Sequence, residues 1–180
     1  MEKLIHDLLL FSRSNKLNKK FEKTDLNEIL KNSIREFDES LKAKEASITG
    51  GILPTIDAIP FQMQQLFNNI ISNSIKYAKE NVPLRISIST KIVVRDEIPD
   101  LQNKTLKYYQ ISIADNGIGF NQQYAENIFA IFSRLHDDSQ YTGTGIGLAI
   151  CKKIADNHKG AISAEGITNS GATFHVFFPV

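Results

Sequence analysis

The sequence has few of the residues that build disulfide frameworks or metal clusters, and it has no long apolar run. Cys151 is the only cysteine, so no internal disulfide can form, and a reduced compartment is expected. No further cysteine is present to build a metal cluster with the four histidines. No apolar run approaches the roughly 18 residues that a membrane span needs, and the charged first turn argues against a signal peptide.

An excess of charge of one sign is also lacking. Lys and Arg total 21 and Asp and Glu total 20, which leaves a formal net charge of +1. No overall field therefore draws the chain to nucleic acid or to a membrane surface. The hydrophobic content of 42% is ordinary for a soluble core, and 180 residues suffice for one domain plus an appended element. We expect a soluble, cytoplasmic segment that contacts neither nucleic acid nor membrane; whether the intact protein is membrane-tethered stays open.

Hydropathy patterning divides the chain into three parts. Residues 1–16 carry apolar side chains at helical spacing, but this helix is too short and too apolar on one stripe to stand alone, so we expect it to pack on a partner helix. Residues 17–24 are polar and are interpreted as a linker. Asp25 can cap a helix over residues 26–41, so the main domain is expected to span residues 25–180.

The main domain combines patterns typical of strands and of helices. Residues 84–94 alternate apolar and polar side chains and a second strand follows at 109–113, so the two are expected to pair as an antiparallel hairpin. Residues 135–142 lack apolar periodicity and are interpreted as a mobile lid. The other expected elements are strands or extended segments at 46–49, 53–56, 161–164 and 173–178, and helices beginning at Pro60 and spanning 122–132 and 147–158.

The long helix that begins at Pro60 has two faces. Its apolar side chains share one face, while Asn69, Asn73 and other polar side chains share the opposite one. Such a polar stripe could simply face water. Asparagine is a poor residue for a helix interior, however, because its amide competes for backbone hydrogen bonds. Two asparagines one turn apart are better explained by a ligand placed over them.

Two glycine-rich stretches follow this helix, Asp115–Phe120 and Gly143–Leu148. A carboxylate can accept a hydrogen bond from the exocyclic amine of adenine, glycines let the backbone approach a ligand closely, and a helix start offers free amides to phosphate. Each feature alone is often a plain turn. In this order, with the asparagine-bearing helix before them, they indicate a nucleotide site.

These motifs resemble those of the ATP-binding catalytic domain of sensor histidine kinases, within the Bergerat-fold ATPases that also include gyrase and the Hsp90 chaperones. The resemblance spans essentially the whole chain. It implies an α+β fold, a two-layer α/β sandwich in which a mixed, mostly antiparallel sheet packs on three helices, preceded by an N-terminal helix. It rests on five ordered motifs: an asparagine box at 69–77, a glycine box at 115–120, a phenylalanine box at 129–132, a second glycine box at 143–147 and a glycine turn at 171–174.

The resemblance also implies that ATP and Mg²⁺ bind. Asn73 would hold Mg²⁺ through its side-chain carbonyl, Asp115 would accept the adenine amine, and Tyr77 would pack beside the base. Arg134 would stabilise charge on the γ-phosphate during transfer, a role weighed evenly against that of a surface arginine beside neighbouring aspartates. The further expected nucleotide-binding positions are Asn69, Lys76, Gly117, Gly119, Phe132, Gly143, Thr144, Gly145, Gly147, Leu148 and Thr173.

The N-terminal helix resembles the second helix of the family's dimerisation hairpin, which pairs with another hairpin into a four-helix bundle. The family's phosphoacceptor histidine lies on the first helix of that hairpin, so transfer is expected to a histidine outside this chain. His6 superficially resembles the acceptor, but Leu9, Leu10 and Phe11 follow it where a basic residue and a proline are expected. The implied partners are ATP, the phosphoacceptor helix, a second subunit in a homodimer, and the receiver domain of a response regulator.

One position separates kinases from hydrolases within this resemblance. Gyrase-like and Hsp90-like ATPases carry a water-activating glutamate one turn before the metal-binding asparagine, and here that position is Asn69. Slow hydrolysis and γ-phosphoryl transfer to a histidine are therefore expected. Two alternatives stay open: a non-catalytic, nucleotide-regulated module that docks a response regulator, and, less favoured, a hydrolytic ATPase.

Overall fold

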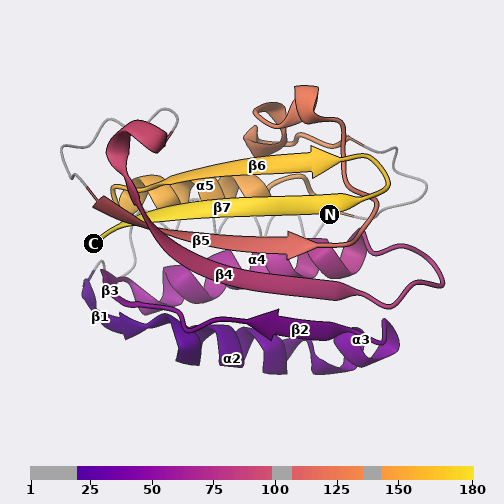
Figure 1. Ribbon diagram of the computed structural model, residues 1–180, viewed down its shortest axis with the longest axis horizontal. Coiled ribbons are helices and arrows are strands. Elements are labelled where there is room, and N and C mark those ends of the chain that lie inside the picture. The colour runs from indigo at the N-terminus through magenta and orange to yellow at the C-terminus, as the bar shows by residue number, and fades with distance from the viewer. Residues whose placement is uncertain (1–19, 99–106, 136–142) are drawn as a thin grey trace.

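A computed structural model describes residues 20–98, 107–135 and 143–180. The chain forms two layers, a sheet and a set of helices behind it (Figure 1). The predicted α+β sandwich is therefore confirmed. The expected N-terminal helix at 1–16 and nearly all of the expected lid at 135–142 lie outside the described residues.

The main sheet has five strands in the order β2-β4-β5-β7-β6. β4 (Arg85–Val94) pairs antiparallel with β5 (Lys107–Asp115), which confirms the predicted hairpin, and β5 pairs antiparallel with β7 (Gly171–Pro179). β6 (Ala161–Ile167) forms one edge, antiparallel to β7, and β2 (Ser47–Gly50) forms the other, parallel to β4. The sheet is mixed and mostly antiparallel, as predicted.

Three longer helices pack on the sheet, namely α2 (Leu26–Glu36), α4 (Pro60–Lys76) and α5 (Gly147–Asn157). α4 lies between the other two and contacts both of them. Met63 and Ile70 of its apolar stripe are fully buried in the larger of the two apolar clusters that the described residues form. Among the helices of the described ranges, none combines the length and the apolarity needed to cross a bilayer.

Local chemistry explains where α4 begins and ends. Pro60 occupies the first turn, where a missing backbone N–H leaves no hydrogen bond unmade. Tyr77 ends the helix with a non-helical backbone, and its amide still donates to the carbonyl of Asn73 at 2.9 Å. Ser74 in the last turn of α4 donates to Asp115, the last residue of β5, at 3.2 Å, so the polar stripe with Asn69 and Asn73 ends near the carboxyl end of β5.

Two predicted helices are divided in the structure. The expected helix at 26–41 breaks at Phe37, whose partly buried side chain packs on the core, and α3 (Asp38–Ala43) follows. The expected helix at 122–132 consists of two short 3₁₀ turns, η2 (Gln122–Tyr124) and η3 (Asn127–Phe129). Helical periodicity does not distinguish a continuous helix from shorter turns that bury the same side chains.

A second, two-stranded sheet joins the start of the domain to the segment before α4. β1 (Glu22–Asp25) pairs antiparallel with β3 (Thr55–Ala58), and the buried Thr24 hydroxyl donates to the Ala58 carbonyl at 3.3 Å. The end of the segment interpreted as a linker, residues 17–24, thus belongs to a strand. Only one of the four β1 residues is buried, so the hydropathy pattern gives no signal for it.

Candidate functional site

Three hydrogen bonds hold the Asp115 carboxylate of the predicted site in place. Its Oδ1 accepts hydrogen bonds from the amides of Gly117 at 2.9 Å and Ala172 at 3.3 Å, and its Oδ2 lies 3.2 Å from the Ser74 hydroxyl. A carboxylate has about four acceptor sites, so about one remains for a ligand donor. Burial raises the pKa of Asp115, and the amide and hydroxyl donors oppose that rise.

The first glycine stretch brings the backbone against the end of α4. The amide of Ile118 donates to the carbonyl of Tyr77 at 2.9 Å. A β-carbon at Gly117 would lie 2.5 Å from that same carbonyl oxygen, so no larger residue fits without moving the backbone. Gly119 has φ +61°, a left-handed conformation that glycine adopts without strain. The two glycines thus permit the contact that sets Asp115 beside Tyr77.

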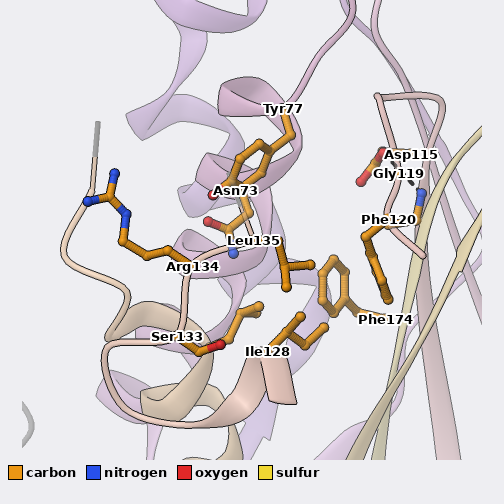
Figure 2. A pocket seen from close by; sticks show the side chains of 12 residues that line it. Asn73, Tyr77, Asp115, Gly119, Phe120, Ile128, Ser133, Arg134, Leu135 and Phe174 are labelled. Carbon is orange, nitrogen blue, oxygen red and sulfur yellow. Dashed lines mark hydrogen bonds between the residues drawn. The ribbon is translucent and has the colours of Figure 1, made fainter. Parts of the chain in front are cut away.

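An apolar pocket of about 80 Å³ opens next to Asp115. Figure 2 shows Asp115 on one side of it and Asn73 with Tyr77 on the other. The side chains between them are apolar and come from separate elements of the chain: Phe120, Ile128, Leu135, Leu148, Ala172 and Phe174. An apolar pocket with one carboxylate at its side suits an aromatic heterocycle with an amine substituent.

A larger cavity of about 650 Å³ lies along the polar face of α4. Asn73, Tyr77, Arg134 and Leu148 line both spaces, so the two are neighbours. The second glycine stretch forms part of its wall through Gly143, Thr144, Gly145 and Gly147. Its volume lies within the range of about 300–1,000 Å³ that is usual for small-molecule sites.

Lys76 brings positive charge to the wall of the larger cavity. Its Nζ donates to the Tyr77 hydroxyl at 2.9 Å and lies 4.5 Å from the centroid of the Tyr77 ring. The position of a β-carbon built on Gly143 is 2.7 Å from the same Nζ, so the ammonium reaches the second glycine stretch. A cation and free backbone amides thus face the same space, an arrangement that suits an anion.

The start of α5 adds backbone donors to this wall. α5 begins at Gly147, and no side chain caps its first amides. The amide of Phe132 donates to the carbonyl of Gly145 at 3.0 Å, which ties the phenylalanine box to the second glycine stretch. The uncapped amides therefore follow a loop held in place from the neighbouring segment, and they can donate hydrogen bonds to phosphate oxygens.

The chemistry of the cavity fits a magnesium ion held mainly by phosphate and water. Within the described ranges no group of three or more His, Cys, Asp or Glu residues could hold a metal ion. Asn73, at the junction of the two spaces, offers a side-chain carbonyl oxygen. Mg²⁺ characteristically keeps several waters and takes one or two protein oxygens together with substrate phosphates. One asparagine oxygen therefore matches a nucleotide-bound Mg²⁺ better than a resident metal centre.

Most of the predicted site residues line one of the two spaces. The pocket or the cavity is lined by Asn69, Asn73, Lys76, Tyr77, Asp115, Gly119, Arg134, Gly143, Thr144, Gly145, Gly147 and Leu148. Figure 2 shows the Arg134 guanidinium directed away from the apolar side chains. The aspartates that the sequence places beside it lie outside the described residues.

Three predicted positions do not line either space. Gly117 acts through its amide on Asp115, and Phe132 is 56% exposed and contacts Gly145 through its backbone. Thr173 lies on β7 between Ala172 and Phe174, which do line the pocket. Because neighbouring strand residues point to opposite faces, the Thr173 side chain lies on the other face of the sheet.

The prediction missed Ser74 and the apolar floor of the pocket. Ser74 directly follows the predicted metal-binding asparagine, and an internal serine on an otherwise apolar face was the available signal. The floor residues Ile128 and Leu135 lie outside the glycine boxes and gave no signal of their own.

The family comparison places most of the chain within a single known group. Residues 58–180 match the family described as "Histidine kinase-, DNA gyrase B-, and HSP90-like ATPase". Cyanobacterial phytochrome A from a Nostoc species is 37% identical over all 180 residues, which correspond to 22% of that protein. An adaptive-response sensory kinase SasA from a Synechococcus species is 30% identical over 185 aligned positions, covering 100% of this chain and 46% of that protein. The chain thus spans less than half the length of each of these two relatives.

Solved structures share the fold at lower identity. Full-length ShkA in complex with AMPPNP superposes with a TM-score of 0.75 at 23% identity, over 98% of this chain and 35% of that one. The catalytic domain of histidine kinase ThkA superposes with a TM-score of 0.68 at 24% identity, over 88% of this chain and 97% of that one. The structure of ThkA in complex with the response regulator TrrA superposes with a TM-score of 0.69 at 20% identity, over 99% of this chain and 46% of that one.

Proposed function

Because the chain belongs to the family of histidine kinase-, DNA gyrase B- and HSP90-like ATPases, we propose that it binds Mg-ATP and transfers the γ-phosphoryl group to a histidine of the intact protein. The described residues that line the larger cavity include amides, a lysine and an arginine but no carboxylate. This observation carries the proposal, because a water-activating base is what a hydrolase needs at this place.

At the base end, Asp115 accepts the exocyclic amine of adenine. Its remaining acceptor site faces the pocket, while the apolar floor supports the ring. Guanine presents a carbonyl oxygen at the corresponding position, and an oxygen facing a carboxylate is repelled. Selectivity for adenine over guanine follows from this one group.

At the phosphate end, the chain's own residues bind and orient the anion. Lys76 and Arg134 supply positive charge, and the amides at the start of α5 supply hydrogen-bond donors. Asn73 offers the oxygen that would hold Mg²⁺. When bound, the ion neutralises phosphate charge and draws the phosphates into one geometry.

The reaction then depends on an acceptor that enters the cavity and excludes water. An imidazole nitrogen needs no base to become a nucleophile, whereas water does. Asn69 occupies the place of the glutamate of hydrolytic relatives, and its amide cannot take up a proton. Transfer to histidine is therefore favoured over hydrolysis.

The partners follow from the proposed reaction. A histidine-bearing helix, a second subunit and a receiver domain of a response regulator would complete the pathway in the intact protein. ThkA, which shares the fold, is described in complex with a response regulator. Relatives named as phytochromes and as sensory kinases support a signalling role.

The test is phosphoryl transfer in the full-length protein with ATP labelled at the γ-phosphate. The proposal predicts protein-bound label that is acid-labile and alkali-stable, as a phosphohistidine is, and little free phosphate. Rapid steady-state release of free phosphate would instead support a hydrolase. Tight ATP binding with no transfer at all would support a non-catalytic docking module.

A further inference from the structure

The larger cavity extends beyond the residues that the nucleotide would occupy. Towards the start of α4 its wall is made of Phe61, Gln64, Gln65 and Asn68, with Ile150 of α5 opposite. Phe61 is 58% exposed at this rim. The rim of this extension offers an aromatic surface on which a helix can pack.

Two neighbouring glutamines of this wall differ in their bonding. Gln64 donates through Nε2 to the Ser33 hydroxyl at 2.7 Å and to the Asn68 side chain at 3.0 Å. The Oε1 of Gln65 is buried and has no hydrogen-bond partner among the described residues. The Asn69 Nδ2, one helical turn further on, is likewise buried and has no nitrogen or oxygen partner among the described residues, only a weak interaction with the Cys151 sulfur. Buried polar groups in folded proteins are almost always paired with a nitrogen or oxygen, so these two atoms of α4 are places where a ligand can add a hydrogen bond.

The two side chains have opposite requirements. Asn69 Nδ2 is a donor, and a phosphoryl oxygen satisfies it. Gln65 Oε1 is an acceptor, and phosphate oxygens of ATP carry no proton to give it. A neutral imidazole supplies what is missing, because it has one N–H donor and, on its other nitrogen, one lone pair. Because the Gln65 Oε1 has no hydrogen-bond partner among the described residues, it gives up no hydrogen bond when the side chain turns towards such a ring.

We propose that Gln65 orients the acceptor histidine by accepting the N–H of its imidazole, so that the other nitrogen faces the γ-phosphorus. This inference rests on the function proposed above. In the step, the lone pair of that nitrogen forms the N–P bond while the bond from phosphorus to the bridging oxygen breaks, and ADP leaves with the electron pair. The proton of the resulting phosphoimidazolium, held against Gln65, leaves to water.

The one-turn spacing supports this assignment. Residues four apart on a helix lie on one face about one turn, roughly 5.4 Å, apart. Gln65 and Asn69 can therefore hold the nucleophile and the group that it attacks from the same rigid helix. Gln64 points to α2 instead, so it provides a control of the same residue type.

The experiment compares Gln65→Met, Gln65→Glu and the control Gln64→Met in the full-length protein. Single-turnover transfer from γ-labelled ATP is followed as a function of pH, and ATP affinity is measured separately. Gln65→Met, which keeps the length but loses the acceptor, is expected to slow transfer by on the order of 100-fold without changing ATP affinity more than about threefold. Gln64→Met is expected to change transfer by less than about threefold, with thermal stability reporting any loss of packing.

Gln65→Glu separates orientation from packing. It keeps the acceptor, so transfer at its best pH is expected to stay within about tenfold of the native protein. A carboxylate also stabilises the imidazolium and raises the acceptor's pKa, so the pH of half-maximal transfer should move upward. A packing role would not move that pH.

Several results would overturn the inference. The inference is rejected if Gln65→Met and Gln64→Met transfer at equal rates, or if the pH profile of Gln65→Glu is unshifted. It is also rejected if Gln65→Met loses ATP binding. In each of these cases the native protein still transfers phosphate to histidine, so the proposed function stands. If the native protein binds ATP but labels no histidine, the proposed function itself fails, and the role of Gln65 fails with it.

Discussion

The two ends of the ligand cavity differ in how completely the protein satisfies its own polar groups. At the base end, Asp115 already accepts two backbone amides and lies beside the Ser74 hydroxyl, and its surroundings are apolar. At the phosphate end, the space is several times larger, and Gln65 and Asn69 each bury an atom with no nitrogen or oxygen partner among the described residues. The base end is preformed, whereas the phosphate end is completed by what binds there.

The contrast implies that the two ends contribute differently to ligand binding. A preformed carboxylate selects the base at low entropic cost, because little moves when the ligand arrives. Unpaired groups and uncapped amides at the other end gain partners only from phosphate, metal and acceptor, so their contribution should depend on each of these. Substitutions at the two ends should therefore fail in distinguishable ways.

The largest effect is expected from Asp115→Asn at the base end. The amide nitrogen repels the adenine amine, so ATP affinity should fall by about 100-fold. Adenosine affinity should fall by the same factor, because the lost contact is with the base. Calorimetric titration with both ligands measures this, and circular dichroism checks that the fold is retained. A variant that lost ATP but kept adenosine would contradict the assignment.

A smaller and different effect is expected from Asn73→Ala at the junction. Removing the proposed metal-binding oxygen should weaken Mg-ATP binding by about 30-fold and leave adenosine binding nearly unchanged. The signature is loss of the difference between titrations with and without Mg²⁺. Asn68→Ala serves as the control, since Asn68 lines the cavity but donates to Glu36 at 2.7 Å. If the Asn73→Ala protein still bound ATP more tightly with Mg²⁺ than without it, the proposed role of Asn73 in holding the metal would be contradicted.

Lys76→Met tests the charge of the phosphate end alone. Methionine keeps much of the apolar stem and loses the ammonium, so ATP affinity should fall by about tenfold. The difference in ATP affinity between native protein and variant should shrink as the salt concentration is raised, because salt screens the attraction between the Lys76 ammonium and the phosphates. Adenosine titrations provide the matched control. An equal loss for adenosine would mean that Lys76 supports Tyr77 and the base, not the phosphates.

The smallest effect concerns the stability of the ligand-free protein. Burial raises the pKa of Asp115, so the folded state holds that proton more tightly than the unfolded chain does. The contribution of Asp115 to the free energy of unfolding is therefore fully present below the unfolded pKa of about 3.9 and declines as pH rises through the folded pKa. The side-chain amide introduced by Asp115→Asn cannot titrate, so this variant should gain stability relative to the native protein as the pH rises from acid to neutral.

Thermal unfolding of both proteins across that pH range measures this effect. The difference in Tm between variant and native protein should widen towards neutral pH. A constant difference would show that the burial of the Asp115 charge carries no cost in the absence of ligand.

The sequence predicted those parts of the fold that repeat a local pattern. The alternation over β4 and the proline at the start of α4 led to the correct hairpin and helix. The glycine stretches led to a predicted site whose residues the fold brings around two neighbouring spaces. β1 was missed because its pairing with β3 is tertiary and buries only one of four residues. The break at Phe37 was missed because both helical pieces share one periodicity.

The site was predictable where a residue acts through its type and was less so where it acts through position. Asp115 and the asparagines of α4 carry a chemistry that a motif reveals. Ile128 and Leu135 matter because the chain folds them under the pocket, which no motif records. Thr173 was assigned from a motif, but strand alternation directs it to the opposite face of the sheet.

The most direct test of this account is a set of calorimetric titrations of the native chain with adenosine, with ATP, and with ATP plus Mg²⁺. A preformed base end and a ligand-completed phosphate end predict measurable adenosine binding, tighter ATP binding, a further gain with Mg²⁺, and no competition by GTP. Equal affinity for adenosine and Mg-ATP, or binding of GTP as tight as that of ATP, would contradict it.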